Sequence, residues 1–492
     1  MNSVCEYFAN FSKTQPNKVA LIEKEKELTY QELYELMRGF CAYLKSKNIR
    51  KGDIVVCRAS ATIDYWVAFL GTLLAGGVFV PLEKDCTQEK IESIIGSFNG
   101  VFALISSEID RQSAFKCKVF VDMKTVADIA KQNDSADVEY EFPAYEDDAV
   151  ILFTTGTTGT SKGVIGQHKY LIESVFRSSQ ICYRNGTRII MPVPMNHLFG
   201  IGRSMTILLY GGTVILLDGL TELKQFFYAL SELEANALAL APSAINYIIT
   251  LVGEEIAEYF KNIEFIEIGG EKMPYQLQKT LIDLLPQVRM YIVYASTETC
   301  VSCIYEFSKY GATGNRIGTP IDKTEIVTVD DDDNEFTATI ENPGFLAVKS
   351  DCMMKCYWND ARATDKIKKG NMIVMSDYGY IDEEGFVCLL GRKGDVIICG
   401  GQKVNPTEVE DCALKSGMIA DCVCFGVKDE IFGSRVSLVV VMKEGIAYDE
   451  GKMQEYLTDN LEYFKVPKVI ACADKIQRNK NGKIDRKYYT KQ

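Results

Sequence analysis

The 492-residue sequence lacks an apolar run long enough to cross a membrane. Its longest apolar stretch, residues 67–82, is interrupted by Gly71, Gly76 and Gly77, and residues 1–16 lack the basic and apolar regions of a signal peptide. Positive charge is in deficit, because 54 Lys and Arg against 67 Asp and Glu leave a net charge of −13. These features predict a soluble protein with no membrane span that binds neither nucleic acid nor an anionic membrane surface.

The chain also lacks a repeated cysteine spacing, although it contains 16 cysteines. Scattered thiols in a long chain without an export signal indicate a cytoplasmic protein with reduced cysteines. Cys300 and Cys303 have metal-ligand spacing, but no histidine follows them, so we interpret them as core residues. Residues 330–334 are acidic but lack the glycine and spaced glutamate of a calcium loop, which favours a solvated hairpin tip.

The most informative stretch is residues 149–163, where an apolar run of strand length ends in a loop of hydroxyls, glycines and one lysine. Glycines at 156, 159 and 163 permit backbone angles that direct successive N–H groups at one anion, and Lys162 adds a positive charge. Short hydroxyl donors are supplied by Thr154, Thr155, Thr157, Thr158, Thr160 and Ser161. This composition predicts a phosphate-binding loop, and the alternative is a simple turn after a buried strand. Ser161 stands where a P-loop NTPase requires glycine, which excludes that fold.

Hydrophobic periodicity predicts an α/β fold. Residues 29–32, Thr-Tyr-Gln-Glu, form a capping box at the start of an amphipathic helix, and strands at 53–57 and 78–82 flank a helix at 64–74. This βαβ unit implies a parallel sheet covered by helices. A second α/β layer is predicted from strands at 188–191, 213–217, 237–240, 265–268 and 290–293.

Short strands and turns between residues 325 and 390 indicate a β-rich subdomain. After Gly391, a helix near 406–414, strands over 422–442, a helix over 449–464 and a final strand predict a small α+β domain. Paired glycines beside charged residues at 391–394 suit an exposed hinge. We therefore expect a large N-terminal domain of stacked α/β layers at 1–390, with the β-rich subdomain at 324–390, and a C-terminal domain at 391–492.

The phosphate loop resembles that of the adenylate-forming (AMP-binding) superfamily, which includes acyl-CoA synthetases, aryl-CoA ligases, luciferases and peptide-synthetase adenylation domains. Four further segments, at 269–271, 294–298, 377–392 and 481–486, resemble motifs of that superfamily in the same order. The resemblance covers nearly the whole chain and implies an AMP-binding N-terminal domain with a mobile catalytic C-terminal domain. The chain departs from the usual pattern at Thr155 and Ser161 in the loop, and at Gly394 in the position of the hinge residue.

The resemblance implies a role for each segment. Glu298 would hold Mg²⁺ beside Thr297, and Asp377 with Arg392 would contact the ribose. Lys483 would meet the substrate carboxylate and the α-phosphate, although a surface lysine in a basic tail is the alternative. The implied catalytic residues are thus Lys483, Glu298, Thr297 and Lys162. The implied ATP- and AMP-binding residues are Thr154, Thr155, Gly156, Thr157, Thr158, Gly159, Lys162, Gly269, Gly270, Glu271, Tyr294, Ala295, Ser296, Thr297, Asp377, Arg392 and Lys483.

Residues 191–200 contain a Pro-x-x-His-x-x-Gly segment similar to that of acyl- and aryl-CoA synthetases. The segment lacks the aspartate with which amino-acid-activating relatives pair the α-ammonium group, which disfavours an α-amino acid. His197, Gly270 and Ala295 would form the acyl pocket, and the Ala295 methyl group suits medium-chain, branched or aromatic acids. His197 is equally well explained as a hydrogen-bonded core histidine.

Gly400 and Gly401 lie in a segment that resembles the thiol tunnel of CoA ligases. The predicted function is an ATP-dependent carboxylic acid:thiol ligase that forms acyl-AMP and pyrophosphate and then a thioester. The expected cofactors and partners are ATP, Mg²⁺, a small carboxylic acid and coenzyme A. Two alternatives remain open: loading of an acid onto a carrier-protein phosphopantetheine, and a non-catalytic relative that binds nucleotide or an acyl ligand.

Overall fold

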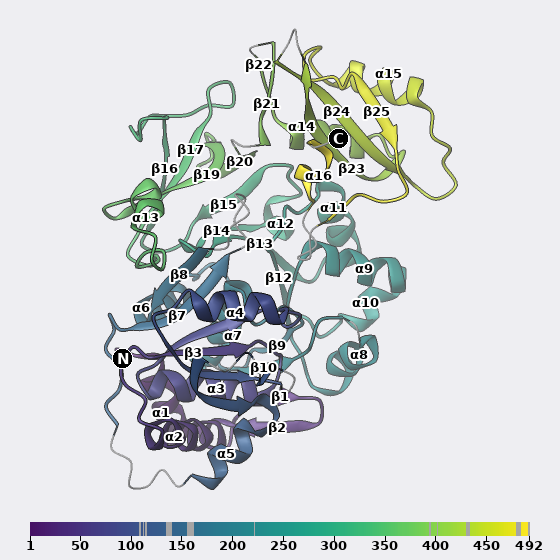
Figure 1. The fold of residues 1–492 in the computed structure, drawn as a ribbon. Helices are drawn as coiled ribbons and strands as arrows, with labels where there is room; N and C mark the ends of the chain where they lie inside the picture. Colours follow the sequence, from purple (N-terminus) through teal and green to yellow (C-terminus); the bar gives the residue numbers. More distant parts are fainter. Residues whose placement is uncertain are drawn as a thin grey trace.

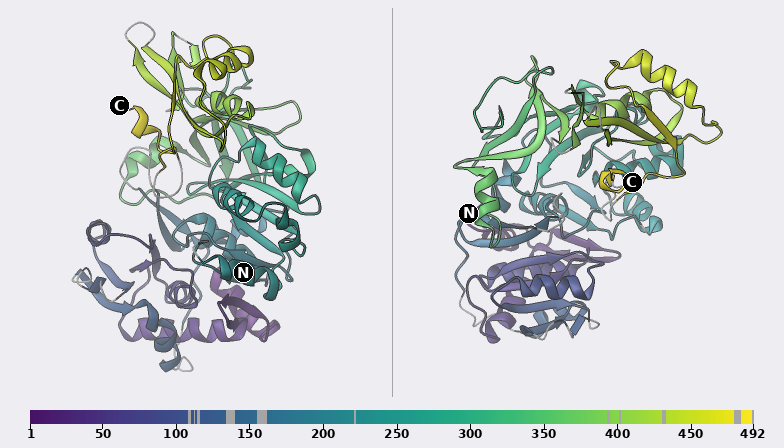
Figure 2. Two further views of the ribbon diagram at one scale, coloured as in Figure 1. Left: turned by 90° about the vertical axis from the view of Figure 1, so that its right-hand side faces the viewer. Right: turned by 45° about the horizontal axis from the view of Figure 1, so that its top comes forward.

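The computed structural model describes residues 1–107, 110–111, 113, 116–133, 140–154, 162–220, 222–392, 395–400, 402–429, 433–478 and 484–490. Strands of the described residues form three sheets, with 6, 14 and 5 strands (Figure 1). The five-stranded sheet lies at one end of the molecule, in the part coloured yellow-green in Figure 2. None of the described helices is long and apolar enough to cross a membrane.

The six-stranded sheet carries the strands on either side of the phosphate loop. Its order is β6-β5-β3-β4-β7-β8, in which β8 alone is antiparallel to its neighbour. The strands are β3 (Ile54–Arg58), β4 (Val78–Leu82), β5 (Val101–Ser106), β6 (Cys117–Asp122), β7 (Asp148–Thr154) and β8 (Lys162–Gln167). The helix α3 (Ile63–Leu74) joins β3 to β4, which confirms the expected βαβ unit.

The helix α2 (Tyr30–Ser46) begins at the predicted capping box. The Thr29 hydroxyl accepts a bond from the Glu32 N–H at 3.2 Å, and the Glu32 carboxylate accepts one from the Thr29 N–H at 2.8 Å. The N-terminal stretch of the chain also contains the helices α1 (Val4–Thr14), α4 (Gln88–Gly96) and α5 (Val126–Gln132). The helix α2 packs against α3 and α5, where its apolar face contributes to the main core.

One part of the largest sheet is a block of parallel strands in the order β13-β12-β11-β9-β10-β1. The strand β2 (Lys26–Thr29) pairs antiparallel with β1 at the edge of this block. The parallel strands are β1 (Val19–Glu23), β9 (Arg188–Met191), β10 (Thr213–Leu216), β11 (Ala237–Leu240), β12 (Phe265–Gly269) and β13 (Arg289–Ser296). The five strands expected in this layer are therefore confirmed. Their connecting helices are α6 (His168–Phe176), α7 (Leu198–Leu209), α8 (Leu223–Glu232), α9 (Pro242–Val252), α10 (Ile256–Tyr259) and α11 (Tyr275–Leu284).

The β-rich segment continues this sheet instead of forming one of its own. The strand β14 turns back beside β13, and β15 pairs with both β14 and β20. These antiparallel strands are β14 (Cys300–Glu306), β15 (Arg316–Pro320), β16 (Thr324–Val329), β17 (Gly344–Ser350), β18 (Lys368–Lys369), β19 (Met372–Ile381) and β20 (Val387–Arg392). The helices α12 (Phe307–Tyr310) and α13 (Ala361–Ile367) were not expected, and α13 begins at Asp360, whose side chain accepts a bond from the Ala363 N–H.

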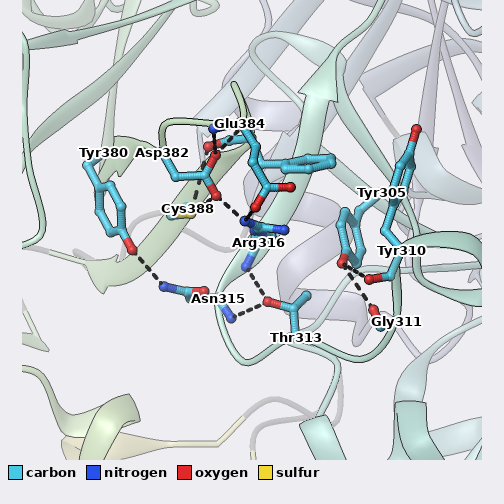
Figure 3. A network of polar contacts seen from close by, with 11 residues as sticks. Tyr305, Tyr310, Gly311, Thr313, Asn315, Arg316, Tyr380, Asp382, Glu384 and Cys388 are labelled. Atoms are coloured by element: carbon cyan, nitrogen blue, oxygen red, sulfur yellow. Dashed lines mark hydrogen bonds and ion pairs between the residues drawn. The ribbon is translucent and has the colours of Figure 1, made fainter.

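Arg316 fixes the turn between β19 and β20 to β15 (Figure 3). Its guanidinium lies 2.8 Å from the Asp382 carboxylate and 2.5 Å from that of Glu384. The neighbouring Asn315 donates to the Tyr380 hydroxyl at 3.3 Å. Because β19 and β20 also carry Asp377 and Arg392, this network ties the strands of two candidate site residues to β15.

Two predictions about individual residues are confirmed. Cys300 and Cys303 are fully buried in the core. Asp330 lies at an exposed turn after β16, where its side chain accepts bonds from the Asp332 and Asn334 N–H groups at 2.9 Å.

The five-stranded sheet forms the last part of the fold. Its strands are β21 (Ile397–Cys399), β22 (Gln402–Val404), β23 (Ile419–Asp429), β24 (Gly433–Met442) and β25 (Val469–Cys472), with α14 (Pro406–Lys415), α15 (Glu450–Asn460) and α16 (Arg486–Thr490). The helix α15 is shorter than expected, because Leu461 is already extended. Glu410 of α14 binds Arg486 through both carboxylate oxygens, at 2.5 and 2.9 Å, and also accepts the Cys424 N–H at 2.7 Å. Burial raises the pKa of Glu410, and the Arg486 charge opposes that rise.

We expect Glu410→Ala to lower the free energy of unfolding of this last part of the fold by roughly 3 kcal/mol, because it leaves a largely buried guanidinium without its partner. Glu408→Ala, on the same helix, removes a carboxylate that is 45% exposed and should cost about 1 kcal/mol or less. Urea unfolding of the full chain, with hydrogen exchange of the β23 and β24 amides, measures both. Equal losses in the two variants would contradict an anchoring role for Glu410.

Candidate functional site

The candidate residues gather beyond the carboxyl ends of parallel strands. The strand β7 ends at Thr154, and Lys162 lies opposite it at the start of β8, with the Thr154 hydroxyl 3.4 Å from the Lys162 carbonyl oxygen. The adjacent strands β12 and β13 end at Gly269 and Ser296. In α/β proteins, ligands bind at this edge of the sheet. Residues 155–161, including Thr155, Gly156, Thr157, Thr158 and Gly159, lie outside the described residues.

Tyr357 joins Lys162 to Glu298. Its hydroxyl donates to the Glu298 Oε1 atom at 2.7 Å, and its ring centroid lies 4.7 Å from the Lys162 Nζ atom. Tyr357 is 6% exposed, and burial, followed by the negative charge of Glu298, raises its pKa. The tyrosine therefore stays a hydrogen-bond donor, and it orients the Glu298 carboxylate while its ring contacts the Lys162 cation.

Sequence analysis missed Tyr357 because no local pattern identifies it. Residues 355–358 lie beside β8, since the Trp358 N–H donates to the Gly163 carbonyl at 2.7 Å and the Ile165 N–H donates to that of Cys356 at 3.0 Å. The Met354 N–H also donates to the Glu298 carbonyl at 2.9 Å. This pairing between distant parts of the chain places Tyr357 at the site.

Hydrogen bonds fix the turn that carries Thr297 and Glu298. The Tyr170 hydroxyl donates to the Thr297 carbonyl at 2.7 Å, and the Ser296 hydroxyl accepts the Thr299 N–H at 3.1 Å. Cys300 then adopts a φ of 58°, in the left-handed region, before β14 begins its return. Ala295 is exposed at a bulge between β13 and β14. The backbone of the turn is thus fixed while the Ala295 methyl group faces open space.

Asp377 is held by two other candidate residues. Its Oδ2 atom accepts a hydrogen bond from the Tyr294 hydroxyl at 2.6 Å, and its Oδ1 atom lies 3.3 Å from the Arg392 Nε atom. Asp377 and Arg392 face each other in the β19–β20 register, and Asp377 is 8% exposed. Burial, followed by the charge of Asp377, raises the pKa of Tyr294. These donors leave lone pairs on both carboxylate oxygens for further hydroxyl groups.

The segment after β12 has the backbone shape of a ligand-facing turn. Gly270 has a φ of 88°, which disfavours a side chain, and a Cβ added there would meet no atom within 4 Å. Glu271 follows it directly. His197 is the residue before α7, and its Nε2 atom lies 3.5 Å from the Asn196 Nδ2 atom. A ligand role for His197 therefore stays a prediction.

The remaining candidates are not brought to this site within the described residues. Gly400 lies at the β21–β22 turn with a φ of 57°. Gly394, Gly401 and Lys483 lie outside the described residues. Arg486, three positions after Lys483, is anchored to Glu410, a partner that the sequence analysis also missed.

Two families of known proteins match this chain. A family model described as AMP-binding enzyme matches residues 8–358, and a model of the AMP-binding enzyme C-terminal domain matches residues 408–483. The 2-succinylbenzoate–CoA ligase of Bacillus subtilis is 26% identical over 95% of this chain and 94% of its own length. The peroxisomal OPC-8:0-CoA ligase 1 of Arabidopsis thaliana is 25% identical over 97% of this chain and 91% of its own.

The chain also resembles solved structures over its whole length. ATP-bound MatB from Rhodopseudomonas palustris superposes with a TM-score of 0.89, at 22% identity, over 100% of this chain and 99% of that one. At this identity the likeness shows the fold alone. It confirms the predicted fold class, a large α/β N-terminal part with a smaller C-terminal part.

We expect Asp377→Asn to weaken AMP binding about 10-fold, because hydrogen bonds to a charged acceptor are stronger than those to an amide. Isothermal titration calorimetry with AMP measures the dissociation constant. Asp333→Asn, an equivalent change at the exposed turn after β16, is the control. An unchanged dissociation constant in Asp377→Asn would remove this carboxylate from the nucleotide site.

Proposed function

Since the chain belongs to the family of AMP-binding enzymes, we propose that it is an ATP-dependent carboxylic acid:CoA ligase. A carboxylate oxygen of the acid attacks the α-phosphorus of ATP, the bond to pyrophosphate breaks, and acyl-AMP forms. A thiol sulfur then attacks the acyl carbon and AMP leaves. The contact of Lys162 and Glu298 with one tyrosine is the observation that carries this proposal.

The residues of the site suit the charges of the first step. Two anions must approach each other, so a cation near the phosphates lowers the barrier. Lys162 supplies one such charge beside the loop. We assign the ribose to Asp377, Tyr294 and Arg392, and the adenine to the backbone of residues 269–271, with Ala295, Ser296, Thr297 and the loop residues near the phosphates. Preorganised donors and acceptors of this kind need little rearrangement during reaction.

Glu298 also fits a Mg²⁺ ion. Magnesium is usually held by one or two carboxylates together with substrate phosphates and water. The Oε1 atom of Glu298 is oriented by Tyr357, and its Oε2 atom makes no hydrogen bond to the described residues. When bound, the ion would neutralise charge on the phosphates, while Tyr357 keeps the carboxylate in place.

We further propose the domain division at 1–390 and 391–492, with Gly394 as the hinge. In this scheme the C-terminal domain brings Lys483 to the α-phosphate for the first step, and residues 400–401 to the thiol for the second. The acceptor is CoA, because the relatives described above are named CoA ligases. Their names do not support a carrier protein. The cytoplasmic location stays a prediction.

Carboxylate-dependent exchange of labelled pyrophosphate into ATP tests the function. We expect exchange with at least one acid in a panel of short, medium-chain, branched and aromatic acids, and thioester when CoA is added. Absence of exchange with every acid, in a preparation that binds ATP, would favour the non-catalytic alternative.

Glu298→Gln should raise the Mg²⁺ concentration required for half-maximal exchange by about 10-fold or more, because a neutral amide holds the ion less well. Glu306→Gln is the matched control, since Glu306 pairs with Arg289 at the other end of β14. A Mg²⁺ titration of both variants gives the comparison. Identical titration curves would remove Glu298 from the metal site.

Lys483→Ala should slow acyl-AMP formation by on the order of 10²–10³, because a cation is lost where negative charge develops. Thioester formation from acyl-AMP supplied ready-made should be largely spared, since the C-terminal domain has turned by then. Lys475→Ala, in the same basic tail, is the control. Equal losses in both half-reactions would rule out the alternation of the C-terminal domain.

A further inference from the structure

A buried polar cluster lies beneath the candidate site, between α7 and the β12–β13 pair. It consists of Tyr183, Arg203 and Glu267, which are 8%, 2% and 0% exposed. The Arg203 Nη1 atom donates to the Tyr183 hydroxyl at 2.8 Å and lies 3.6 Å from the Glu267 Oε2 atom. Charged groups at this depth are rare unless their hydrogen-bonding capacity is used.

The hydrogen-bonding capacity of Glu267 is only partly used. Arg203 and Tyr183 are the polar neighbours of its carboxylate, yet neither carboxylate oxygen is within hydrogen-bonding geometry of a donor among the described residues. Buried groups with unmet capacity are rare in folded proteins and call for an explanation, such as a ligand that completes them.

The cluster is aligned with the acyl side of the candidate site. Alternate residues of a strand share a face, so Glu267 points the same way as Gly269, whose register partner Val293 points the same way as Ala295. On that face a Cβ at Gly269 would lie 3.3 Å from the Phe199 ring, which belongs to α7. Arg203 follows Phe199 by four residues on the same side of the helix. The layer of Phe199 and Gly269 thus separates the cluster from the exposed Ala295.

The distance along β12 from Gly269 to Glu267 matches the length of a short acyl group. Glu267 lies two residues below Gly269, a rise of about 7 Å along β12. A chain of five or six atoms, or one aromatic ring, spans that length. Phe199 is partly exposed, so its ring can turn aside when an acid enters.

Resting on the proposed function, we propose that the acid substrate carries a hydrogen-bond donor, such as a hydroxyl group, at the end remote from its carboxylate. The donor binds the Glu267 carboxylate, which lies beside Arg203 and Tyr183. The unmet atoms are the acceptor oxygens of Glu267, which favours a donor over a second carboxylate. Glu267 is thus a specificity-determining residue and takes no part in bond formation.

Pyrophosphate exchange with matched acids tests this inference. The pairs are pentanoate with 5-hydroxypentanoate and benzoate with 4-hydroxybenzoate, and glutarate is added as a second-carboxylate probe. In the wild-type protein, kcat/KM should be ~10-fold or more higher for a hydroxylated acid than for its partner, because a site built for a hydroxyl penalises its absence. A ratio near 1 for both pairs, or a preference for glutarate, would overturn the proposal.

Variants separate recognition from packing. Glu267→Leu should bring the hydroxyl preference close to 1, and Glu267→Gln, which keeps one acceptor oxygen, should give an intermediate ratio. A purely structural role would lower kcat/KM for both acids of a pair alike and leave the ratio unchanged, which would contradict the proposal. Glu264→Gln, at an exposed ion pair before β12, is the control. Melting curves establish that each variant is folded.

The exchange assay separates the ligase function from the hydroxyl preference. If the apolar acids support exchange without any hydroxyl preference, the ligase function stands and this inference falls. If no acid supports exchange in the wild-type protein, the ligase function itself falls. Should Glu267→Leu not fold, the wild-type ratios and the Glu267→Gln ratio still decide the question.

Discussion

The hydrogen bond from Tyr357 to Glu298 joins three segments that are far apart in the chain. It connects the turn after β13 with residues 355–358, which pair with β8, and β8 begins at Lys162. The two largest sheets thus meet at one buried hydroxyl group. A carboxylate next to the phosphates of ATP is repelled by their negative charge. The Tyr357 hydroxyl, a fixed donor, and Lys162, a cation against the Tyr357 ring, keep the Glu298 carboxylate in position. The proposed adenylation chemistry depends on this connection more than on any single loop.

The buried carboxylates of Glu410 and Glu267 differ in how completely they are hydrogen-bonded. Glu410 uses both oxygens on Arg486 and accepts a backbone N–H as well, which is the pattern of a pair that serves stability. Glu267 lies near Arg203 and Tyr183, but neither of its oxygens is within hydrogen-bonding geometry of a donor in the part of the chain that the structure describes. Burial raises the pKa of Glu267, and the Arg203 charge opposes that rise. Glu410 is fully hydrogen-bonded, whereas the unmet bonds of Glu267 cost free energy. A hydrogen bond from a substrate donor would offset that cost.

Much of the fold could be predicted from the sequence, because short apolar runs between turn residues define the strands. The strands β9 and β11 have the expected bounds for this reason. The pairing of β15 with β20, which fuses the β-rich segment to the parallel sheet, depends on long-range register that periodicity does not encode. The same holds for the site: Glu298 and Asp377 stand in recognisable local motifs, whereas the roles of Tyr357 and Glu410 depend on side-chain partners 59 and 76 residues away.

A double-mutant cycle on pyrophosphate exchange tests whether Tyr357 acts through Glu298. The variants are Tyr357→Phe, which keeps the ring beside Lys162 and removes the hydroxyl, Glu298→Gln, and the combination of both, each measured at saturating Mg²⁺ with a productive acid. We predict that Tyr357→Phe slows exchange about 10-fold in the parent chain and has little further effect once Glu298 is replaced. Rate losses that multiply in the double variant would show that the two residues act independently and would contradict the coupling of Tyr357 to Glu298.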